Sequence, residues 1–526
     1  MPTRSRDLAL VVALATLVTI AMAFPVLRAP SERLFGMDLV GRHHDPFTVM
    51  RLFDAPLSLG ASVQPVTDIT GALIARVTGV VAAVNWMVLT TFPLAAAAAF
   101  LLARHLGMTT TSAAIAALAF AFSPFHMAQA AYHPHIAQVQ WLPLYFLALW
   151  RGLDDASPAS MAMIAIATIG VTFSNLYGGL IAAVLTPTGM LLYWLTRSRG
   201  QPRALRHVLM TSATLLTLVA IAWLGLRQLF PGGLGDPMLL RFADSDPFKY
   251  SAKWWSYLVP PIAHPWLGTV ARGIWDRADV HEGLLEQQVT LGVGLILLAL
   301  VAVLDWTRHR RATAAHWAVP MLAIIAVVAL VCSLSPERTI AGVTIARPSA
   351  LLFKWLPMFR SFARFGSIVQ LMTALLAGIG VTVLWQRRGA FARAACVACL
   401  LLAASEYIVS PASMSRDVLP TSAHRWLMKL PGTVHALDCT PLTQESESVQ
   451  WLTHNRVTMA GGDLGDCLDA RIGDTLAQHG YTHLLVRADD RAHLFLASPP
   501  PVAGLRLEQH FADADVFAVT RRREHP

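Results

Sequence analysis

The run LALVVALATLVTIAMAFPV, at residues 8–26, decides the class of this protein. It is apolar throughout and long enough to cross the hydrocarbon core of a bilayer. The basic segment MPTRSRD precedes it, and Pro25 and Arg28 lie at its end. A signal peptide also begins with basic residues and an apolar run, but we interpret this segment as an uncleaved first membrane span.

Composition extends this interpretation to the whole chain. Of the 526 residues, 55% are hydrophobic and 14% are charged, and the mean hydropathy is +0.52. Soluble proteins carry about 25% charged residues. The net charge of +9 comes mostly from arginines between apolar runs, which indicates membrane topology rather than nucleic-acid binding. The chain is therefore predicted to be a mainly α, polytopic helical membrane protein.

Apolar runs that reach or approach the length of a membrane span recur along the sequence, which predicts about 11 transmembrane helices. The third, fourth and fifth runs are short for a span. The cores of these runs are Leu8–Val26, Val80–Leu102, Thr111–Phe122, Ala137–Trp150, Ser160–Phe173, Gly179–Leu195, Leu205–Phe230, Val289–Trp306, Ala318–Leu334, Ser367–Leu384 and Ala392–Val409.

The charges between these runs predict the orientation of the chain. The N-terminus and the connectors after even-numbered spans are rich in arginine, as the positive-inside rule expects of the cytoplasmic face; only Arg151 is offset by neighbouring acids. Few lysines beside many alanines favour a bacterium with a GC-rich genome. We therefore expect a multi-pass protein of the bacterial inner (plasma) membrane with a cytoplasmic N-terminus. The long outer loops would be residues 29–70, 231–288 and 335–366.

The composition changes near Ser410, where a polar tail of residues 410–526 follows the membrane domain of residues 1–409. The tail has the alternation and turn residues of a small α+β domain. On the predicted topology this domain is extracytoplasmic. Its expected strands are Val434–Leu437, His483–Val486 and Val516–Val519, and its expected helix is Ala470–Gln478.

Two cysteines of the tail, Cys439 and Cys467, would face an oxidising compartment on this topology. They are therefore candidates for a disulfide. A bridge that closes a loop of this length contributes roughly 3–4 kcal/mol in the chain-entropy account. Two free thiols are the alternative.

The first outer loop, MDLVGRHHDPFTVMRLFDAP at residues 37–56, gathers acids and histidines just beyond a span. A carboxylate there can accept a proton from an incoming hydroxyl group or hold a metal that binds a phosphate. Asp45 and Asp38 are the candidate catalytic residues, and His43 and His44 are candidate substrate-binding residues. The alternative for Asp45 is a structural role, because Asp45-Pro46 also suits the first turn of a helix.

A second polar cluster lies in AFSPFHMAQAAYHPHIAQVQWLPLYF, residues 121–146, between two predicted spans. Tyr132, His133 and His135 are candidates for lining a sugar or phosphate pocket. The alternative is that these histidines bond to the backbone or to lipid headgroups. Two histidines one residue apart are a weak metal signature without a third ligand, so the metal ligands are not assigned.

Two later loops supply charged candidates. Glu282 is a candidate for orienting an acceptor. Arg360 and Arg364, four residues apart in FRSFARF, are expected on one helix face, where guanidinium groups suit a phosphate. A basic anchor at the lipid headgroups is the alternative.

The sequence lacks the motifs of several soluble enzymes. It has no Walker loop, no dinucleotide-binding glycine fingerprint in its structural context, no HExxH and no GxSxG. Nucleotide hydrolysis by this chain is therefore not expected.

Four segments together resemble bacterial polytopic glycosyltransferases of the C type (GT-C). They are the His-His-Asp45-Pro46 segment, the turn FAFSPFHMAQAAYHPHIAQVQWLPL, the segment Phe359–Phe365 before a span rich in small residues, and the tail GYTHLLVR…FADADVFAV. The resemblance implies a sugar donor on polyprenyl phosphate and a catalytic or metal-binding acid in the first outer loop. By that resemblance Asp45 is the first candidate and Asp38 the second, and a divalent metal is a candidate cofactor.

The predicted function is transfer of a hexose or pentose from a polyprenyl-phosphate carrier to an envelope glycan, lipid or protein at the outer face of the membrane. A transporter or flippase for lipid-linked saccharides is the first alternative, and it predicts ionisable residues in the middle of spans and two related halves. A non-catalytic assembly protein is the second alternative.

Overall fold

A computed structural model describes most of the chain. The described residues are 2–37, 64–229, 242–281, 283–308, 314–340, 342–387, 389–417, 421–439, 446, 449–450, 453, 456–462, 467, 471–488 and 504–520. Every structural statement below concerns these residues.

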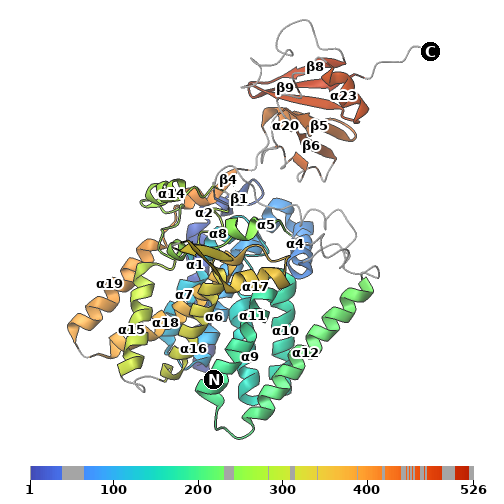
Figure 1. The fold of residues 1–526 in the computed structure, drawn as a ribbon. Helices are drawn as coiled ribbons and strands as arrows, with labels where there is room; N and C mark the ends of the chain where they lie inside the picture. Colours follow the sequence, from blue (N-terminus) through green and yellow to red (C-terminus); the bar gives the residue numbers. More distant parts are fainter. Residues whose placement is uncertain are drawn as a thin grey trace.

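The first three quarters of the chain form a helical bundle, and a five-stranded sheet lies beyond one end of it (Figure 1). We call this end of the bundle the sheet end. The long helices of the bundle are α1 (Pro2–Met22), α5 (Val80–Leu89), α6 (Thr91–His105), α7 (Thr110–Ala121), α9 (Trp141–Asp155), α10 (Pro158–Ser174), α11 (Leu176–Tyr193), α12 (Ala204–Leu229), α15 (Val293–Arg308), α16 (Val319–Ser333), α18 (Gly366–Gln386) and α19 (Ala390–Glu406).

A helix occupies each of the predicted apolar runs, and the protein is an integral membrane protein. Among the described residues, six helical stretches are long and apolar enough to span a membrane, or seven if the bent pair α7 and α8 (Pro124–Ala130) is one span. The helices α9, α10, α15 and α19 are shorter than this. The count of about 11 spans is therefore not confirmed and stays a prediction.

Local sequence explains where several helices begin. Ser123-Pro124 starts α8 and Ser157-Pro158 starts α10, with each serine Oγ accepting a hydrogen bond from the backbone N–H three residues on. Serine satisfies an N–H group that the first turn leaves open, and proline suits the first helical position because it has no N–H. These caps place the turns between neighbouring helices.

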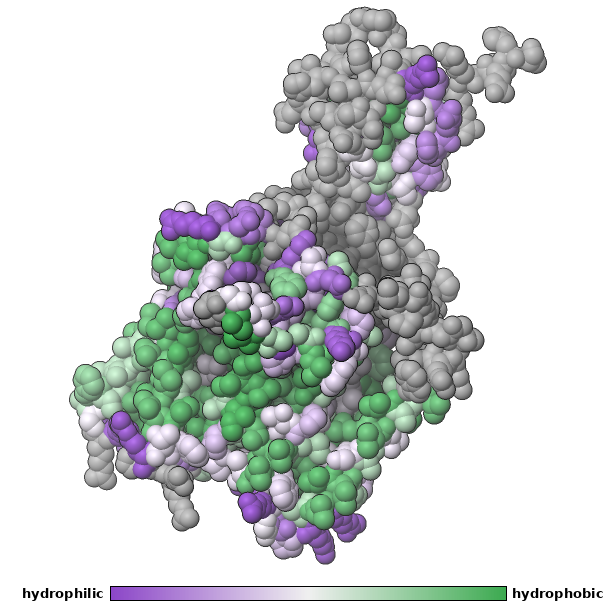
Figure 2. All heavy atoms as spheres, viewed as in Figure 1, coloured by the Kyte–Doolittle hydropathy of each residue, from purple (hydrophilic) through white to green (hydrophobic). Residues whose placement is uncertain are grey.

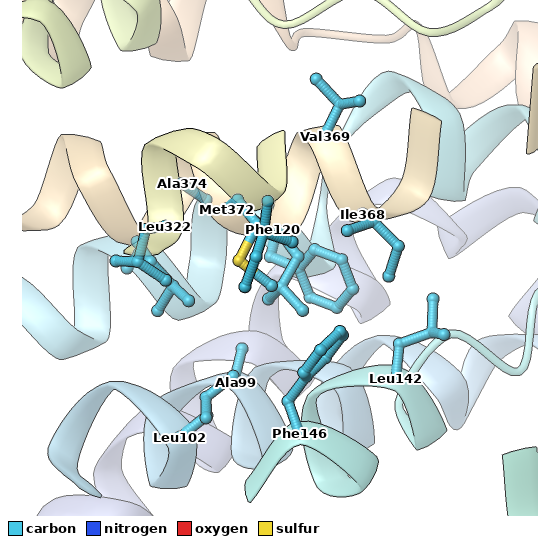
Figure 3. Close-up of a cluster of buried hydrophobic side chains, with 14 of the residues drawn as sticks. Ala99, Leu102, Phe120, Leu142, Phe146, Leu322, Ile368, Val369, Met372 and Ala374 are labelled. Carbon is cyan, nitrogen blue, oxygen red and sulfur yellow. The ribbon is translucent and has the colours of Figure 1, made fainter. Parts of the chain in front are cut away.

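Helix α18 is the centre of the bundle, and its span-forming stretch is buried. Its side chains interdigitate with those of α6, α7, α9 and α16, as the close-up of Ala99, Phe120, Phe146, Leu322 and Met372 shows (Figure 3). Glycine lets α15 approach α18 closely: a Cβ on Gly380 would lie 1.9 Å from the Leu298 carbonyl oxygen. Small residues at such crossings are typical of membrane helices.

The tail forms a five-stranded sheet in the order β6-β5-β7-β9-β8. The strands β5, β6 and β7 are parallel, and β9 and β8 continue the sheet antiparallel. The helix α23 (Ile472–Gln478) lies between β6 and β7 in the sequence. The strands are β5 (Val434–Asp438), β6 (Val457–Gly461), β7 (His483–Arg487), β8 (Leu505–His510) and β9 (Ala514–Val519). The structure pairs Cys439 with Cys467 as a disulfide, with Cα atoms 5.9 Å apart.

Shorter elements cover the sheet end of the bundle (Figure 1). Strand β1 pairs antiparallel with β4, which ties the chain after the first helix to the chain after α19. These elements are α2 (Phe24–Leu27), β1 (Arg33–Phe35), α4 (Pro65–Thr78), α14 (Gly268–Arg277), β2 (Glu337–Ile340), β3 (Val343–Ala346), α17 (Pro348–Trp355), η6 (Phe362–Phe365), η7 (Pro411–Met414) and β4 (Ser415–Asp417). The helix α20 (Ser422–Leu427) belongs to the sheet domain, where it packs against β9.

Surface hydropathy follows this arrangement. In Figure 2 hydrophobic side chains cover the flank of the bundle, and hydrophilic ones gather at its two ends. An apolar flank between polar ends is what a bilayer requires of a spanning protein.

Candidate functional site

The centre of the candidate site is a buried ion pair between Arg364 and Glu286. Arg364 is the third residue of η6, which directly precedes α18, and Glu286 lies in the connection between α14 and α15. The Arg364 Nη2 and Nε atoms donate to Glu286 Oε1 at 2.6 and 3.0 Å. Their side chains are only 9% and 5% exposed. Because a buried charge is costly without a partner, each residue depends on the other.

The pair has further polar and aromatic neighbours. Gln129 at the end of α8 donates from Nε2 to Glu286 Oε2 at 3.4 Å, and its own Oε1 is buried with no hydrogen bond among the described residues. The guanidinium carbon of Arg364 lies 4.1 Å from the centre of the Tyr177 ring. Asn175 holds Tyr177 at the start of α11 by accepting from its backbone N–H at 3.1 Å. Three separate turns therefore meet at Arg364.

The connection that carries Glu286 is fixed by its two neighbours. Gln287 accepts from the Ser256 hydroxyl at 2.8 Å and donates to the Ser251 carbonyl at 2.8 Å. Gln288 accepts from the backbone N–H of Ile262 at 3.1 Å. Buried side-chain amides that bond to backbone in this way hold irregular chain in place. The carboxylate of Glu286 is therefore held where Arg364 meets it.

Arg360 lies close by in a more open position. Its Nη1 donates to Asp246 Oδ2 at 3.0 Å, its guanidinium carbon lies 4.2 Å from the Phe242 ring, and its side chain is 37% exposed. The neighbouring Phe359 ring is 5.0 Å from that of Tyr177. Both arginines are thus on a segment that packs against the start of α11.

The expectation that Arg360 and Arg364 share one helix face is wrong. Arg360 precedes η6, which is a 3-10 helix of four residues, and no α-helix includes either arginine. The backbone N–H of Ala363 donates to the Tyr250 carbonyl at 3.1 Å instead of to a helical partner. A tertiary hydrogen bond has replaced the helical one.

A small cavity adjoins Arg364. It has a volume of about 20 Å³, enough for a water molecule. Arg364, Tyr177, Asn175, Gln138 and Ser367 are among its lining residues. It is too small for a sugar, so any sugar site extends beyond it.

The predicted pocket residues Tyr132, His133 and His135 lie in the turn between α8 and α9, shortly after Gln129 in the sequence. The Tyr132 hydroxyl donates to the carbonyl of Met37. The rings of His133 and His135 are 5.5 Å apart. Burial, with a smaller contribution from the positive charge of Arg364, lowers the pKa of His135 to about 3. This shift favours the neutral form of the His135 imidazole, which can form hydrogen bonds but carries no charge.

Both ends of the first-loop segment are attached to this region. At one end Tyr132 holds Met37, the residue before Asp38. At the other end the Thr67 hydroxyl of α4 donates to the Ser174 carbonyl at 2.7 Å, next to Asn175. Met37 and Thr67 are therefore each bonded to a turn that follows or precedes a residue of the cluster, Gln129 and Tyr177 respectively.

Some predicted site residues lie outside the described residues. They are Asp38, His43, His44, Asp45 and Glu282. Among the described residues, no group of three or more histidine, cysteine, aspartate or glutamate side chains is placed to hold a metal ion. The roles of these residues stay predictions.

Sequence reasoning missed Glu286, Gln129 and Tyr177 as members of one cluster. A signal for the first was available, because Glu286-Gln287-Gln288 is a polar run directly before an apolar span, and all three residues are buried. Asp68 is a further buried acid, 1% exposed on α4 beside the same region. These residues come from turns that are far apart in the sequence, so no local spacing pattern could have grouped them.

Comparisons place the chain in a family and a fold class. Residues 65–405 match the family described as Domain of unknown function (DUF6311), and the chain belongs to that family. No curated protein matches the sequence.

The similar solved structures include a longer protein, AftD, and one of about the same length, ArnT. Two cryo-EM structures of the arabinofuranosyltransferase AftD from Mycobacteria align with TM-scores of 0.58 and 0.57 at 14% and 15% identity. They cover 99% and 98% of this chain but only 42% and 40% of AftD. The chain thus spans less than half the length of AftD. A crystal structure of ArnT from Cupriavidus metallidurans bound to undecaprenyl phosphate aligns with a TM-score of 0.44 at 13% identity, over 98% of this chain and 99% of that one. The chain has the fold of the GT-C glycosyltransferases.

Proposed function

We propose that this member of the DUF6311 family is a glycosyltransferase. It moves a sugar from a polyprenyl-phosphate carrier to an envelope glycan, lipid or protein at the sheet end of the bundle. The observation that carries this proposal is the Arg364–Glu286 cluster, which lies in a GT-C fold where two loop ends and a basic segment meet. The connector charges support a sheet end that faces away from the cytoplasm.

The two arginines are suited to the carrier phosphate. Glu286 engages Nε and Nη2 of Arg364, which leaves Nη1 outside this pair on a side chain that lines the cavity. Arg360 is more exposed and keeps a second guanidinium nearby. Guanidinium groups bind phosphate oxygens by charge-assisted hydrogen bonds. Here they would stabilise the negative charge that grows on the phosphate as it leaves.

The reaction needs one base. The bond between the anomeric carbon and the phosphate oxygen breaks, and the carrier phosphate leaves with the electron pair. An acceptor oxygen forms a bond to that carbon, and its proton passes to a carboxylate, for which Asp45 is the first candidate and Asp38 the second. Positioning by the protein supplies much of the rate when the leaving group is already good.

The attachment of the first loop supports this assignment of roles. Tyr132 fixes the carbonyl of Met37, the residue before Asp38, and Tyr132 is next to His133 in the sequence. A neutral His135 can donate or accept a hydrogen bond from a sugar hydroxyl group. His43, His44 and Glu282 are proposed as further substrate contacts on chemical grounds alone.

A divalent metal would find its donors in the first loop and the carrier phosphate. The described residues provide no three-ligand cluster, so no step of the reaction is assigned to a metal. Carboxylate and phosphate oxygens are the ligands that Mg²⁺ prefers. Chelation of membranes before an activity assay separates a metal-dependent reaction from a metal-independent one.

The test replaces the first-loop acids one at a time. We expect Asp45→Asn, and more weakly Asp38→Asn, to abolish one envelope glycan in cells while its polyprenyl-phosphate sugar accumulates, as measured by mass spectrometry. Asp54→Asn, in the same loop, is the matched control and should leave the profile unchanged. Membrane insertion is checked for each variant.

A wild-type profile in well-inserted Asp45→Asn and Asp38→Asn cells, when deletion of the gene alters the profile, would contradict the proposed chemistry. That result would favour the transporter or assembly alternatives.

A further inference from the structure

A second cavity lies on the opposite flank of the bundle from α10 and α12. It has a volume of about 520 Å³ and is enclosed by α1, α7, α15 and α19. We call it the α1–α19 groove. Leu14, Val18, Leu118, Leu400 and Ala404 are among its lining residues. A volume of this size is within the range of small-molecule sites.

The lining residues of the groove have almost no polar side-chain groups that a ligand could bind. Tyr407 carries the one hydroxyl group among its lining residues. That hydroxyl accepts from Gln370 and donates to the Leu291 carbonyl at 2.8 Å, so it is already used. The remaining lining is hydrocarbon and sulfur. The chemistry therefore selects a hydrocarbon chain.

The groove lies in the half of the bundle nearer the sheet end. Its α1 residues run from Leu14 to Met22, in the second half of that helix, and its α19 side extends through Val409 to Pro411 of η7. Helix α1 is long and apolar enough to span a membrane. A chain in the groove would therefore come from the leaflet at the sheet end.

A positive charge follows the groove-lining residues of α1 in the sequence. Leu14, Val18 and Ala21 line the groove at helical spacing, and Pro25 and Arg28 extend that spacing through α2. Only Ala23, with φ −96° and ψ 11°, separates α1 from α2. Seven residues of continuous helix rise about 10 Å, so with the break at Ala23 this is an upper limit for the rise from Ala21 to Arg28.

The surroundings of Arg28 suit a phosphate. Arg28 and Arg33 both line a cavity of about 400 Å³ beside Phe24 and Pro25, and no carboxylate lines it. Among the described residues, Arg28 is exposed and forms no ion pair, including with the nearby Glu32. A basic group at the membrane surface attracts anionic lipid headgroups.

Aromatic residues mark the same depth. Trp266, which is 70% exposed, lies two residues before α14, which is at the sheet end in Figure 1. Val270 on α14 is 59% exposed. Indole rings prefer the headgroup region of a bilayer. Trp266 therefore indicates that the sheet end of the bundle lies at the headgroup level, and Arg28 follows α1 towards that end.

We propose that the α1–α19 groove binds one acyl chain of an anionic glycerophospholipid, whose phosphate lies at Arg28. The site is separate from the Arg364 cluster, because α1, α15 and α19 supply none of that cluster's residues. The lipid would fill a cavity that otherwise separates α1 from α19 and so would hold the first helix against the bundle.

The test measures lipid retained by the full-length protein. The protein is exchanged into mild detergent with equimolar phosphatidylglycerol and phosphatidylethanolamine, and native mass spectrometry counts bound lipid. We expect wild type to keep one phosphatidylglycerol. Arg28→Gln should reduce the preference for the anionic lipid about fivefold, the effect of one basic residue near an anionic surface.

Two variants fill the groove from opposite walls. Ala404→Phe on α19 and Ala21→Phe on α1 start from exposed alanines that line it, so each should fold and lose the bound lipid. Leu401→Phe is the matched control, because Leu401 is 66% exposed on α19 and does not line the groove.

Three results would overturn the proposal. The first is full lipid retention by both filled variants. The second is an unchanged preference for phosphatidylglycerol in Arg28→Gln. The third is displacement of phosphatidylglycerol from wild type by undecaprenyl phosphate, which would assign the groove to the carrier.

Discussion

Two buried arginine–carboxylate pairs in this protein differ in how completely their hydrogen bonds are used. In the sheet, Arg487 donates to Asp438 at 2.8 Å, and Asp438 also accepts from the Ser446 hydroxyl at 3.0 Å. The Ser446 Oγ is in turn 3.2 Å from His424 Nε2. In the bundle, the Arg364–Glu286 pair leaves one oxygen of Gln129 buried and unbonded among the described residues and adjoins a cavity.

This difference in hydrogen bonding leads us to propose that the sheet pair is structural and that the bundle pair binds a ligand. A closed network has little left to offer a ligand, and it stabilises the fold because each group satisfies another. An open network in a cavity can gain bonds when a ligand arrives. We therefore propose that the pair in the sheet stabilises the fold and that the pair in the bundle binds the substrate, and the predictions below test this proposal.

The largest expected effect follows from replacing both members of the bundle pair. In Arg364→Met with Glu286→Leu, the apolar side chains fill the site without leaving a charge unpaired, so the protein should stay folded. Loss of the phosphate contact should lower the transfer rate by about 10²–10³-fold, as removal of one stabilising donor does in other enzymes. The rate of glycan labelling in membranes measures this. A normal rate would contradict the assignment of function to this pair.

Breaking the sheet pair should instead affect stability. Asp438→Ala leaves Arg487 without its carboxylate, and we expect a loss of about 3 kcal/mol, towards the lower end for buried pairs. Arg487 is 27% exposed, so water partly compensates it. Hydrogen exchange of β5 and β7 in the full-length protein measures the change. Unaltered protection of these strands would show that the network does not hold the sheet.

A smaller effect should come from the aromatic ring against Arg364. Tyr177→Leu removes a cation–π contact worth about 1–2 kcal/mol at a buried site, which should raise KM for the lipid-linked donor more than it lowers kcat. Tyr177→Phe keeps the ring and is the control. Equal KM values in the two variants would mean that the ring does not position Arg364.

The smallest effect concerns pH. The folded pKa of His135, about 3, lies below its ordinary value of 6.5, so the unfolded chain binds this proton first as pH falls. His135 therefore favours folding above pH 6.5, and that contribution is lost as pH falls towards 3. The pH–rate profile between pH 5 and 8 should therefore show no change that comes from titration of His135. His135→Gln should keep the shape of the pH–rate profile, and a shifted limb would contradict a neutral His135.

Most of the helices could be predicted because the length of an apolar run is visible in consecutive residues of the sequence. The bundle helices lie in the apolar runs, and β5, β7 and β9 lie where strands were expected. The strands β6 and β8 were missed. Strand β8 exposes five of its six residues, so it has no buried–exposed alternation to detect, and β6 ends in Ala460-Gly461, which are poor strand formers.

The candidate site was less accessible to sequence reasoning because distant turns build it. Arg364 was proposed, but its partner Glu286 is 78 positions earlier and was not. The expected helix face of Arg360 and Arg364 failed because Tyr250, from another loop, takes the Ala363 N–H. Tertiary contacts of this kind override local spacing.

Affinity for polyprenyl phosphate tests the central claim most directly. Binding of undecaprenyl phosphate to the full-length protein in detergent is compared between Arg364→Met with Glu286→Leu and Arg487→Met with Asp438→Leu, both checked for folding. The account predicts that the bundle variant binds roughly 10–100-fold more weakly than wild type, the range for lost hydrogen bonds to a charged group, and that the sheet variant binds normally. Equal affinity in the two variants would contradict it.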